Sequence, residues 1–308
     1  MTMLTNKLDL PSAFVNFEAR NPHDGEGADY TVTTLIDSPR VHRLKSDHEH
    51  EITEDVSDRI FSILGTAVHA ILEKGAAPED IAEQRFHAEF GLRGKEENVT
   101  VSGQVDLQEK GPEGTTIVDY KTCSASTLRY NPDGKPDWES QVNFYAELAR
   151  LNGVKDIIGL EVVAICRDWN RRSLETAERN RSFYPESPVV RVPIKMWERE
   201  VALKYILERI GIHEEAKMTL PECSPEEMWM QPEKWPVYKG GFKRASRLLP
   251  TQTAAVIYAE EKTGDAGHES KIYWVGNPRP AVFTRCDKYC AVAPFCEQKA
   301  QRDENQTR

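Results

Sequence analysis

Two aspartates and a lysine near the middle of the chain have the types and spacing of a hydrolytic metal site. Asp119 and Lys121 stand two positions apart in the apolar segment TTIVDYKT, so on a β-strand their side chains point to one face, about 6.6 Å apart. Asp106 ends the preceding apolar segment, where a hairpin-like connection can bring it beside Asp119. Converging carboxylates repel unless a cation lies between them, and Mg²⁺ and Mn²⁺ prefer such oxygen ligands. The lysine can orient or deprotonate a water, or stabilise developing negative charge.

An Asp-x-Lys triplet alone is more typical of a solvated strand face. Here its setting favours a site, because the triplet follows Ile117 and Val118, and Gly103 precedes Asp106 at short range. A glycine within a strand often marks a close approach of another backbone or a ligand. His69 lies on a predicted helix and is either a structural histidine or a nitrogen ligand, which would favour Mn²⁺.

Gln141 and Tyr145 stand one turn apart on a later predicted helix. By themselves they form one side of an amphipathic helix. Close to a phosphodiester they would contact the DNA backbone or sugar.

The six cysteines fall into two groups. Cys123 and Cys166 lie in apolar predicted strands and are expected to be buried, inert thiols. The other four lie in the last third of the chain and form a candidate metal site: Cys223, Cys286, Cys290 and Cys296. Four thiolates suit either a [4Fe–4S] cluster or Zn²⁺; the alternative is a set of cysteines without a metal.

Two basic segments are candidates for DNA contact. Cations beside aromatic residues suit single-stranded DNA, through phosphate neutralisation and base stacking, although a solvated surface explains either segment equally well. The cations are Lys239, Lys243, Arg244 and Arg247, beside Trp235, Tyr238 and Phe242, and, after the last core strand, Arg167, Arg171 and Arg172.

Composition limits the class of protein that holds these residues. The 308 residues are 39% hydrophobic and 29% charged, which is ordinary for a soluble globular protein. The net charge of −10 argues against bulk, non-specific nucleic-acid binding but leaves room for a local basic groove. No apolar run approaches the roughly 18 residues of a membrane span, and the polar start MTMLTNKLDL does not resemble a signal peptide. We therefore expect a cytoplasmic protein that does not bind membranes.

The elements that must position the site follow from periodicity. Helical spacing runs through SDRIFSILGTAVHAILEKG, three strand patterns follow between residues 84 and 122, and a second helix and a strand run to Cys166. The order is helix, three strands, helix, strand, which predicts an α/β fold with a mixed sheet. We expect a helical and loop flank at 1–56, a core at 57–195, a helical and cysteine-rich region at 196–300, and a disordered tail at 301–308.

With these motifs in this order, the sequence resembles the PD-(D/E)XK nuclease superfamily in its RecB-like branch, a restriction-endonuclease-like fold. The resemblance covers roughly residues 57–166 and is carried by GTAVHAILE, SGQVDL, VDYKT and QVNFY. It implies that His69, Asp106, Asp119 and the carbonyl of Tyr120 bind Mg²⁺ or Mn²⁺ and that Lys121 is the catalytic lysine. Glu83 matches an acidic position of the family, or is an exposed surface glutamate.

The flanks TVTTLIDSPR and RCDKYCAVAPFC resemble those of phage-encoded members, akin to CRISPR-associated RecB-like exonucleases. This implies an exonuclease acting on DNA ends or single strands in phage recombination or replication, in the bacterial host cytoplasm, with a phage recombination or single-strand-binding protein as a partner. It also favours iron–sulfur over zinc, although related iron–sulfur members take a first cysteine from before the core and this chain has none before Cys123. The alternatives are a structure-specific endonuclease on the same core and an inactive DNA-binding subunit.

Overall fold

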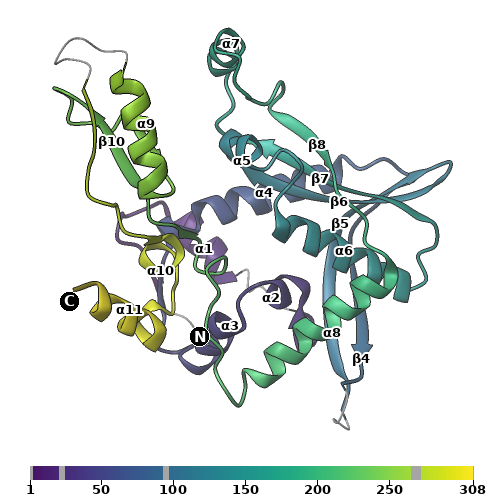
Figure 1. Cartoon of the computed structure of the whole chain (residues 1–308). Coiled ribbons are helices and arrows are strands. Elements are labelled where there is room, and N and C mark those ends of the chain that lie inside the picture. Colours follow the sequence, from purple (N-terminus) through teal and green to yellow (C-terminus); the bar gives the residue numbers. More distant parts are fainter. Residues whose placement is uncertain (1–2, 21–24, 93–96, 265–271, 308) are drawn as a thin grey trace. The chain divides into compact units, whose positions relative to one another are not determined.

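The computed structural model of the chain describes residues 3–20, 25–92, 97–264 and 272–307 (Figure 1). The chain divides into two compact units, Met1–Pro221 and Glu222–Arg308, and each is described by itself. The boundary lies after helix α8 (Arg199–Glu215), so this helix belongs to the first unit. The sequence had assigned it to the C-terminal region.

The first unit is built on a mixed sheet of six strands. The strands follow the order β2-β5-β6-β7-β8. Strand β4 lies off this path and also pairs with β5. Only β2 with β5 and β6 with β7 are parallel, and the remaining neighbours are antiparallel. The strands are β2 (Tyr30–Thr31), β4 (Ile81–Phe90), β5 (Val99–Gly111), β6 (Gly114–Cys123), β7 (Ile157–Cys166) and β8 (Val189–Pro193).

The predicted order of helix, three strands, helix and strand is confirmed by α4, β4, β5, β6, α6 and β7. Helix α4 (Ile60–Lys74) ends at Gly75, as its sequence predicts. It is preceded by a 3₁₀ turn (Val56–Arg59), which is capped by the Asp55 side chain accepting a hydrogen bond from the Ser57 N–H. Helix α6 (Pro136–Leu151) begins with a proline, whose fixed φ and missing N–H suit the first turn.

The main core lies between this sheet and α6, which contacts β4, β5, β6 and β7 (Figure 1). Most apolar side chains of α6 are buried, including Val142, Phe144 and Leu148, and they belong to one cluster with Val105 and Ile117 of the sheet. The middle of β7 is buried at Leu160, Val162 and Ala164, which belong to the same cluster.

Shorter helices complete the first unit. Ser38 caps α3 immediately before Pro39, which explains why the chain breaks between α2 and α3. Strand β1 (Met3–Thr5) pairs with β3 (Thr53–Asp55). The helices are α1 (Ser12–Arg20), α2 (Val32–Ile36), α3 (Pro39–Asp47), α5 (Ala125–Tyr130) and α7 (Arg171–Arg179).

The second unit holds two small sheets and three helices among the residues that the structure describes. One sheet has the order β11-β10-β12 and the other pairs β9 with β13. The strands are β9 (Met230–Gln231), β10 (Trp235–Lys239), β11 (Arg247–Leu249), β12 (Tyr273–Val275) and β13 (Val282–Phe283). The helices are α9 (Gln252–Gly264), α10 (Thr284–Lys288) and α11 (Glu297–Thr307).

Residues 301–307 are helical, where composition had predicted a disordered tail. Two ion pairs explain the difference: Lys299 with Asp303, one turn apart, and Arg302 with Asp287 of α10 at 2.6 Å. Within the described ranges, no helix is both long and apolar enough to span a membrane.

Candidate metal centre

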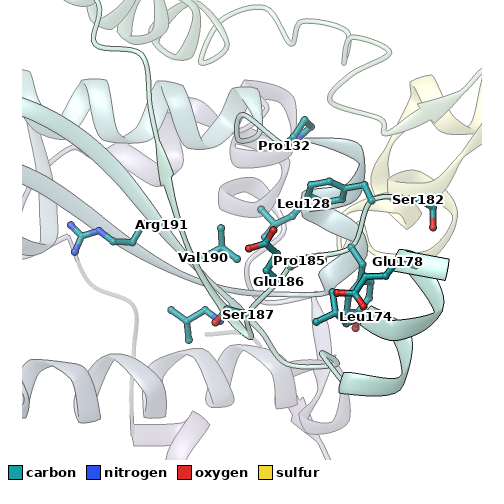
Figure 2. Close-up of a pocket in the computed structure, with 14 residues that line it drawn as sticks. Leu128, Pro132, Leu174, Glu178, Ser182, Pro185, Glu186, Ser187, Val190 and Arg191 are labelled. Atoms are coloured by element: carbon teal, nitrogen blue, oxygen red, sulfur yellow. The ribbon is translucent and has the colours of Figure 1, made fainter. Parts of the chain in front are cut away.

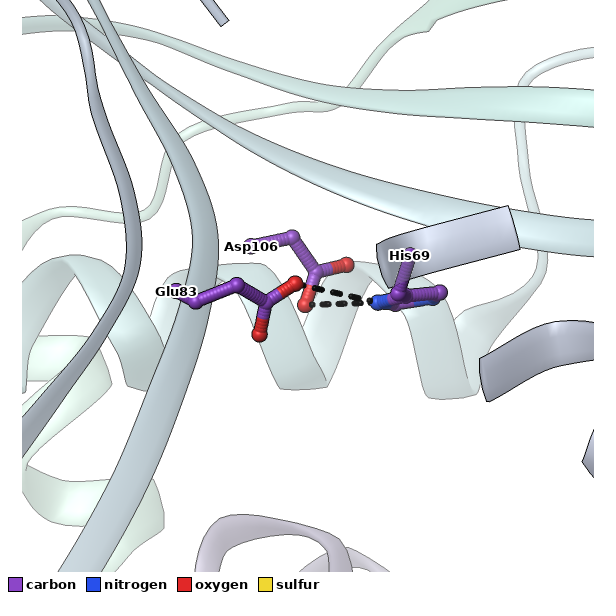
Figure 3. A group of neighbouring side chains, drawn as sticks. All are labelled: His69, Glu83 and Asp106. Atoms are coloured by element: carbon purple, nitrogen blue, oxygen red, sulfur yellow. Dashed lines mark ion pairs between the residues drawn. The ribbon is translucent and has the colours of Figure 1, made fainter. Parts of the chain in front are cut away.

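Three side chains from three elements of the first unit converge on one point (Figure 3). His69 comes from α4, Glu83 from β4 and Asp106 from β5, and one ligand atom of each lies within 4.8 Å of the others. His69 Nδ1 is 3.5 Å from Glu83 Oε1 and 3.5 Å from Asp106 Oδ1. Among the described residues, these three form the group of histidine, cysteine, aspartate or glutamate residues whose ligand atoms lie within 4.8 Å of one another.

The backbone of β6 joins this group at Tyr120. Its N–H donates a hydrogen bond of 2.7 Å to Asp106 Oδ2, and its carbonyl oxygen lies 3.1 Å from His69 Nε2. Adjacent ligands of an octahedral ion with bonds of about 2.1 Å lie about 3 Å apart. The two carboxylates face His69 Nδ1 and the Tyr120 carbonyl faces Nε2, so an ion would bind the imidazole through one of these two nitrogens. Carboxylate, imidazole and carbonyl groups are the donors expected for Mg²⁺ or Mn²⁺, with imidazole favouring Mn²⁺. The residues present therefore fit a hard divalent cation.

Asp119 and Lys121 share one face of β6, as their spacing predicts. Lys121 Nζ donates a 3.1 Å hydrogen bond to Asp119 Oδ1 and lies 2.8 Å from Oδ2. Asp119 is 1% exposed, and its Oδ2 accepts no hydrogen bond of good geometry from the described residues. Asp119 is not among the three residues that meet the 4.8 Å spacing, whereas Glu83 is.

The electrostatics of the site follow from this packing. Hydrogen bonds to Asp106 and to Glu83 outweigh burial and raise the pKa of His69 to about 10. Burial raises the pKa of Asp119 to about 6, against the opposing charge of Lys121. Burial lowers the pKa of Lys121, but the Asp119 carboxylate outweighs it and the net direction is upward. The three carboxylates of Glu83, Asp106 and Asp119 outnumber the two cationic side chains beside them, so a bound divalent cation would neutralise excess negative charge.

Gln141 and Tyr145 lie on α6 as predicted, but both are buried, at 6% and 5% exposed. The Gln141 amide donates a 2.8 Å hydrogen bond to the Tyr145 hydroxyl. Burial, with the charges of Asp119 and Asp106, raises the pKa of Tyr145. The pair is thus largely buried near Asp119 and Asp106, and its contact with DNA stays a prediction.

Sequence reasoning missed two residues that hold Glu83. Gln104 of β5 donates a 2.6 Å hydrogen bond to Glu83 Oε2, and Arg85 donates one of 2.6 Å to Gln104 Oε1. Strand alternation is the sequence signal that could have identified Arg85, because this residue stands two positions after Glu83.

The predicted cations of the first unit lie beyond the last core strand. Arg167 is exposed and its guanidinium lies 4.3 Å from the centre of the Phe61 ring on α4, the helix that carries His69. Arg171 and Arg172 begin α7 and are exposed, and Arg171 lies 3.7 Å from Glu175. The predicted cations Lys239, Lys243, Arg244 and Arg247 belong to the second unit.

The cysteines separate as predicted. Cys123 and Cys166 are buried and face each other in the β6–β7 ladder. Cys223, Cys286, Cys290 and Cys296 all belong to the second unit and are half-buried. Burial raises the pKa of Cys286, and the nearby thiols of Cys290 and Cys296 raise it further, whereas Arg302 lowers it. Gln298 stands two residues after Cys296. Its side-chain oxygen accepts a 2.9 Å hydrogen bond from the Cys223 N–H, and its amide donates one of 3.0 Å to the Cys223 carbonyl.

A pocket of about 630 Å³ opens elsewhere on the first unit (Figure 2). Leu128 of α5, Leu174 of α7 and Val190 of β8 contribute apolar surface to it. None of the predicted site residues lines it.

One comparison with known proteins, that with family models, identifies a domain of this chain. Residues 75–182 match the family model of the PD-(D/E)XK nuclease superfamily, a range that includes Glu83, Asp106, Asp119 and Lys121. No curated protein matches the chain. A solved structure titled "Crystal structure of SSO0001" is 15% identical with a TM-score of 0.44, over 71% of this chain and 86% of that one. This chain therefore carries a domain of the PD-(D/E)XK nuclease superfamily.

Proposed function

We propose that the chain is a Mg²⁺- or Mn²⁺-dependent deoxyribonuclease that hydrolyses phosphodiester bonds at DNA ends. The match to the superfamily supports a metal-dependent nuclease. One structural observation supports hydrolysis at this site. The Lys121 ammonium is held on Asp119, and the intervening Tyr120 is bonded to Asp106 of the His69–Glu83–Asp106 group. A lysine and a set of hard ligands thus share one short stretch of β6.

The ligands that we assign are His69, Asp106, Asp119 and the Tyr120 carbonyl, with Glu83 added by its position in the group. A divalent ion bound there would withdraw charge from the scissile phosphate and make a bound water more acidic. Asp119 lies outside the converging group, so we expect its carboxylate to join the others only when an ion is bound.

We assign to Lys121 the role of positioning the attacking water. Its ammonium would orient the water, or stabilise negative charge on the phosphoryl oxygens. Attack forms a new P–O bond and breaks the bond to the 3′-oxygen, leaving a 5′-phosphate and a 3′-hydroxyl. Arg167 lies over Phe61 of α4, where it can neutralise a phosphate of the same strand.

We also propose that Cys223, Cys286, Cys290 and Cys296 hold one metal centre, [4Fe–4S] or Zn²⁺. The support is their common unit, the charge interaction of Cys286 with Cys290 and with Cys296, and the hydrogen bonds between Gln298 and Cys223. Among the described residues these four thiols do not form a group with the close ligand spacing of His69, Glu83 and Asp106, so binding a metal would have to draw them together. Its role would be structural, since a metal bound only by the folded state adds to folding free energy. The phage setting, the cytoplasmic location and a recombination or single-strand-binding partner are proposals that rest on the resemblance of the flanks.

Cleavage of end-labelled linear DNA beside covalently closed circular DNA tests the activity. With Mg²⁺ or Mn²⁺, we expect linear DNA to be shortened from its ends and the circle to stay intact, with no cleavage in excess chelator. Nicking of the circle would replace the exonuclease with an endonuclease on the same core. DNA binding without cleavage in either metal would leave an inactive DNA-binding subunit.

A further inference from the structure

Helix α9 covers one face of the three-stranded sheet of the second unit. Val237 of β10 is fully buried against Ala255 and Ala259 of α9. The neighbouring Tyr273 and Val275 of β12 pack into the same cluster. Because side chains alternate along a strand, Tyr238 of β10 and Trp274 of β12 project from the opposite face.

The opposite face carries an ordered pair of aromatic rings. Tyr238 and Trp274 are direct partners in the β10–β12 ladder. Their rings stack with centroids 4.6 Å apart and an interplanar angle of 21°. A Cβ on Gly276 would lie 2.6 Å from Tyr238 Cε2, so only glycine leaves room for the ring. Trp274 is nevertheless 50% exposed, and Leu248 on the neighbouring strand is 40% exposed.

The segment that carries β10 and β11 is locally basic. Between residues 234 and 259 the chain has five cations and no aspartate or glutamate, whereas the whole chain has a net charge of −10. Lys239 and Arg247 alternate with Tyr238 and Leu248 and so lie on the α9 side of the sheet, where Arg247 lies over the ring of Tyr258. Lys243 and Arg244 are exposed in the connection between β10 and β11, next to Phe242, which is 62% exposed. Two cations and an exposed ring thus stand at the end of the sheet where β10 turns into β11.

We infer that the Tyr238–Trp274 face binds single-stranded DNA, with a base stacked on Trp274 and phosphates near Lys243 and Arg244. Exposed aromatic rings and cations together are the two elements of single-strand binding. Bases in a duplex are already stacked on each other, so a flat indole gains little from them. The inference rests on the proposed function, because it names the form of DNA that the nuclease would receive.

The test compares two variants that differ in the ring alone. Trp274→Leu keeps an apolar side chain and removes the indole, whereas Trp274→Phe keeps an aromatic surface. Both are made in a Lys121→Ala background, which prevents cleavage under the proposed mechanism, and binding to a fluorescent oligo-dT is followed by anisotropy. We expect Trp274→Leu to bind about tenfold more weakly and Trp274→Phe to lose much less. Phe183→Ala, which removes an equally exposed ring from the first unit, should bind as the background does.

The outcomes separate this inference from the proposed function. Equal binding by the Leu and Phe variants would overturn the stacking surface, as would an equal loss of affinity for blunt duplex DNA. The nuclease proposal is tested separately, by Mn²⁺-dependent hydrolysis of bis(4-nitrophenyl) phosphate by the wild-type chain. Failure of that hydrolysis beside a ring-dependent loss of oligo-dT binding would reject the nuclease and keep the DNA-binding face.

Discussion

Glu83 and Asp106 stand opposite each other on β4 and β5, and the regular pairing of the two strands is interrupted between them. Ala82 pairs with Leu107 and Gln84 with Val105, but Glu83 has a φ of 50° and takes no part in the ladder. A left-handed conformation costs a non-glycine residue about 1–2 kcal/mol. Strain of this kind gathers at functional sites, and here it falls where two carboxylates meet.

Glu83→Asn should separate the function of this position from its stability. Asparagine tolerates the left-handed conformation and removes one of two facing carboxylates, which offsets the lost contact with His69. We expect the free energy of unfolding to stay within about 1 kcal/mol of wild type, while metal-dependent cleavage is lost. Urea denaturation and the linear-DNA assay measure the two. A destabilisation of several kcal/mol would make Glu83 a structural residue.

Lys121→Met should remove catalysis and leave the metal site in place. The variant keeps the aliphatic stem but not the ammonium that lies 2.8 Å from Asp119. We expect cleavage to fall about 100- to 1000-fold, as for the loss of one electrostatic group from a reaction centre. Mn²⁺ affinity, measured by calorimetry, should change little. Lys110→Met on β5 is the matched control, because this lysine bonds only Gln108 and Thr115 in the described structure.

The part of this fold that the sequence predicts is the part set by local periodicity. Helix α4 and strands β5 and β6 follow from apolar spacing, and Asp119 and Lys121 share a face because of strand alternation. Asp106 comes close to Asp119 because only a short connection joins β5 to β6. These relationships depend on residues that are near in sequence.

What the sequence did not predict depends on pairing between distant segments. Glu83 joins His69 and Asp106 only through the β4–β5 register and the helix above it. The burial of Gln141 and Tyr145 depends on which side of α6 meets the sheet, whereas the motif alone suggested DNA contacts. The helical C-terminal residues depend on Arg302 reaching Asp287, which composition cannot indicate.

Gly103→Ala should destabilise the first unit by overpacking. A Cβ there would lie 2.8 Å from Val32 Cγ2, 2.9 Å from Leu148 Cδ1 and 3.0 Å from Tyr145 Cδ1. We expect a loss of about 2 kcal/mol in the free energy of unfolding, measured in urea. The control is Gly211→Ala in α8, where nothing lies within 4 Å of the new Cβ. That change should stabilise the helix by up to about 1 kcal/mol.

Loss of one C-terminal cysteine should release metal and loosen the second unit. Anaerobically purified protein should be brown with about four irons per chain for [4Fe–4S], or colourless with one zinc for the alternative. Cys290→Ser should lose the metal and become sensitive to proteolysis between residues 222 and 308, because ligation contributes to folding. Cys166→Ser, in the first unit, should keep the metal. Wild-type protein free of both metals, purified without chelator or oxidation, would defeat the proposed centre.

His213 of α8 forms a buried triangle of rings with His42 and Tyr30, with centroids 5.5 to 5.7 Å apart. It is 2% exposed, and neither ring nitrogen has a hydrogen-bond partner among the described residues. Burial, followed by the charges of Arg209 and His42, lowers the pKa of His213 to about 4. The folded chain therefore holds this imidazole neutral at pH values where the unfolded chain protonates it.

His213→Leu should make the chain less sensitive to acid. With a pKa of about 6.5 unfolded and about 4 folded, the wild type keeps its full stability above pH 6.5 and loses it as the pH falls toward 4. The loss from this residue is about 2 kcal/mol at pH 5, and the leucine variant should lack it. Urea denaturation at pH 7.5 and pH 5 measures the difference, and a variant of the exposed His87 should behave as wild type. An unchanged pH dependence in His213→Leu would mean that this imidazole is protonated in the folded chain.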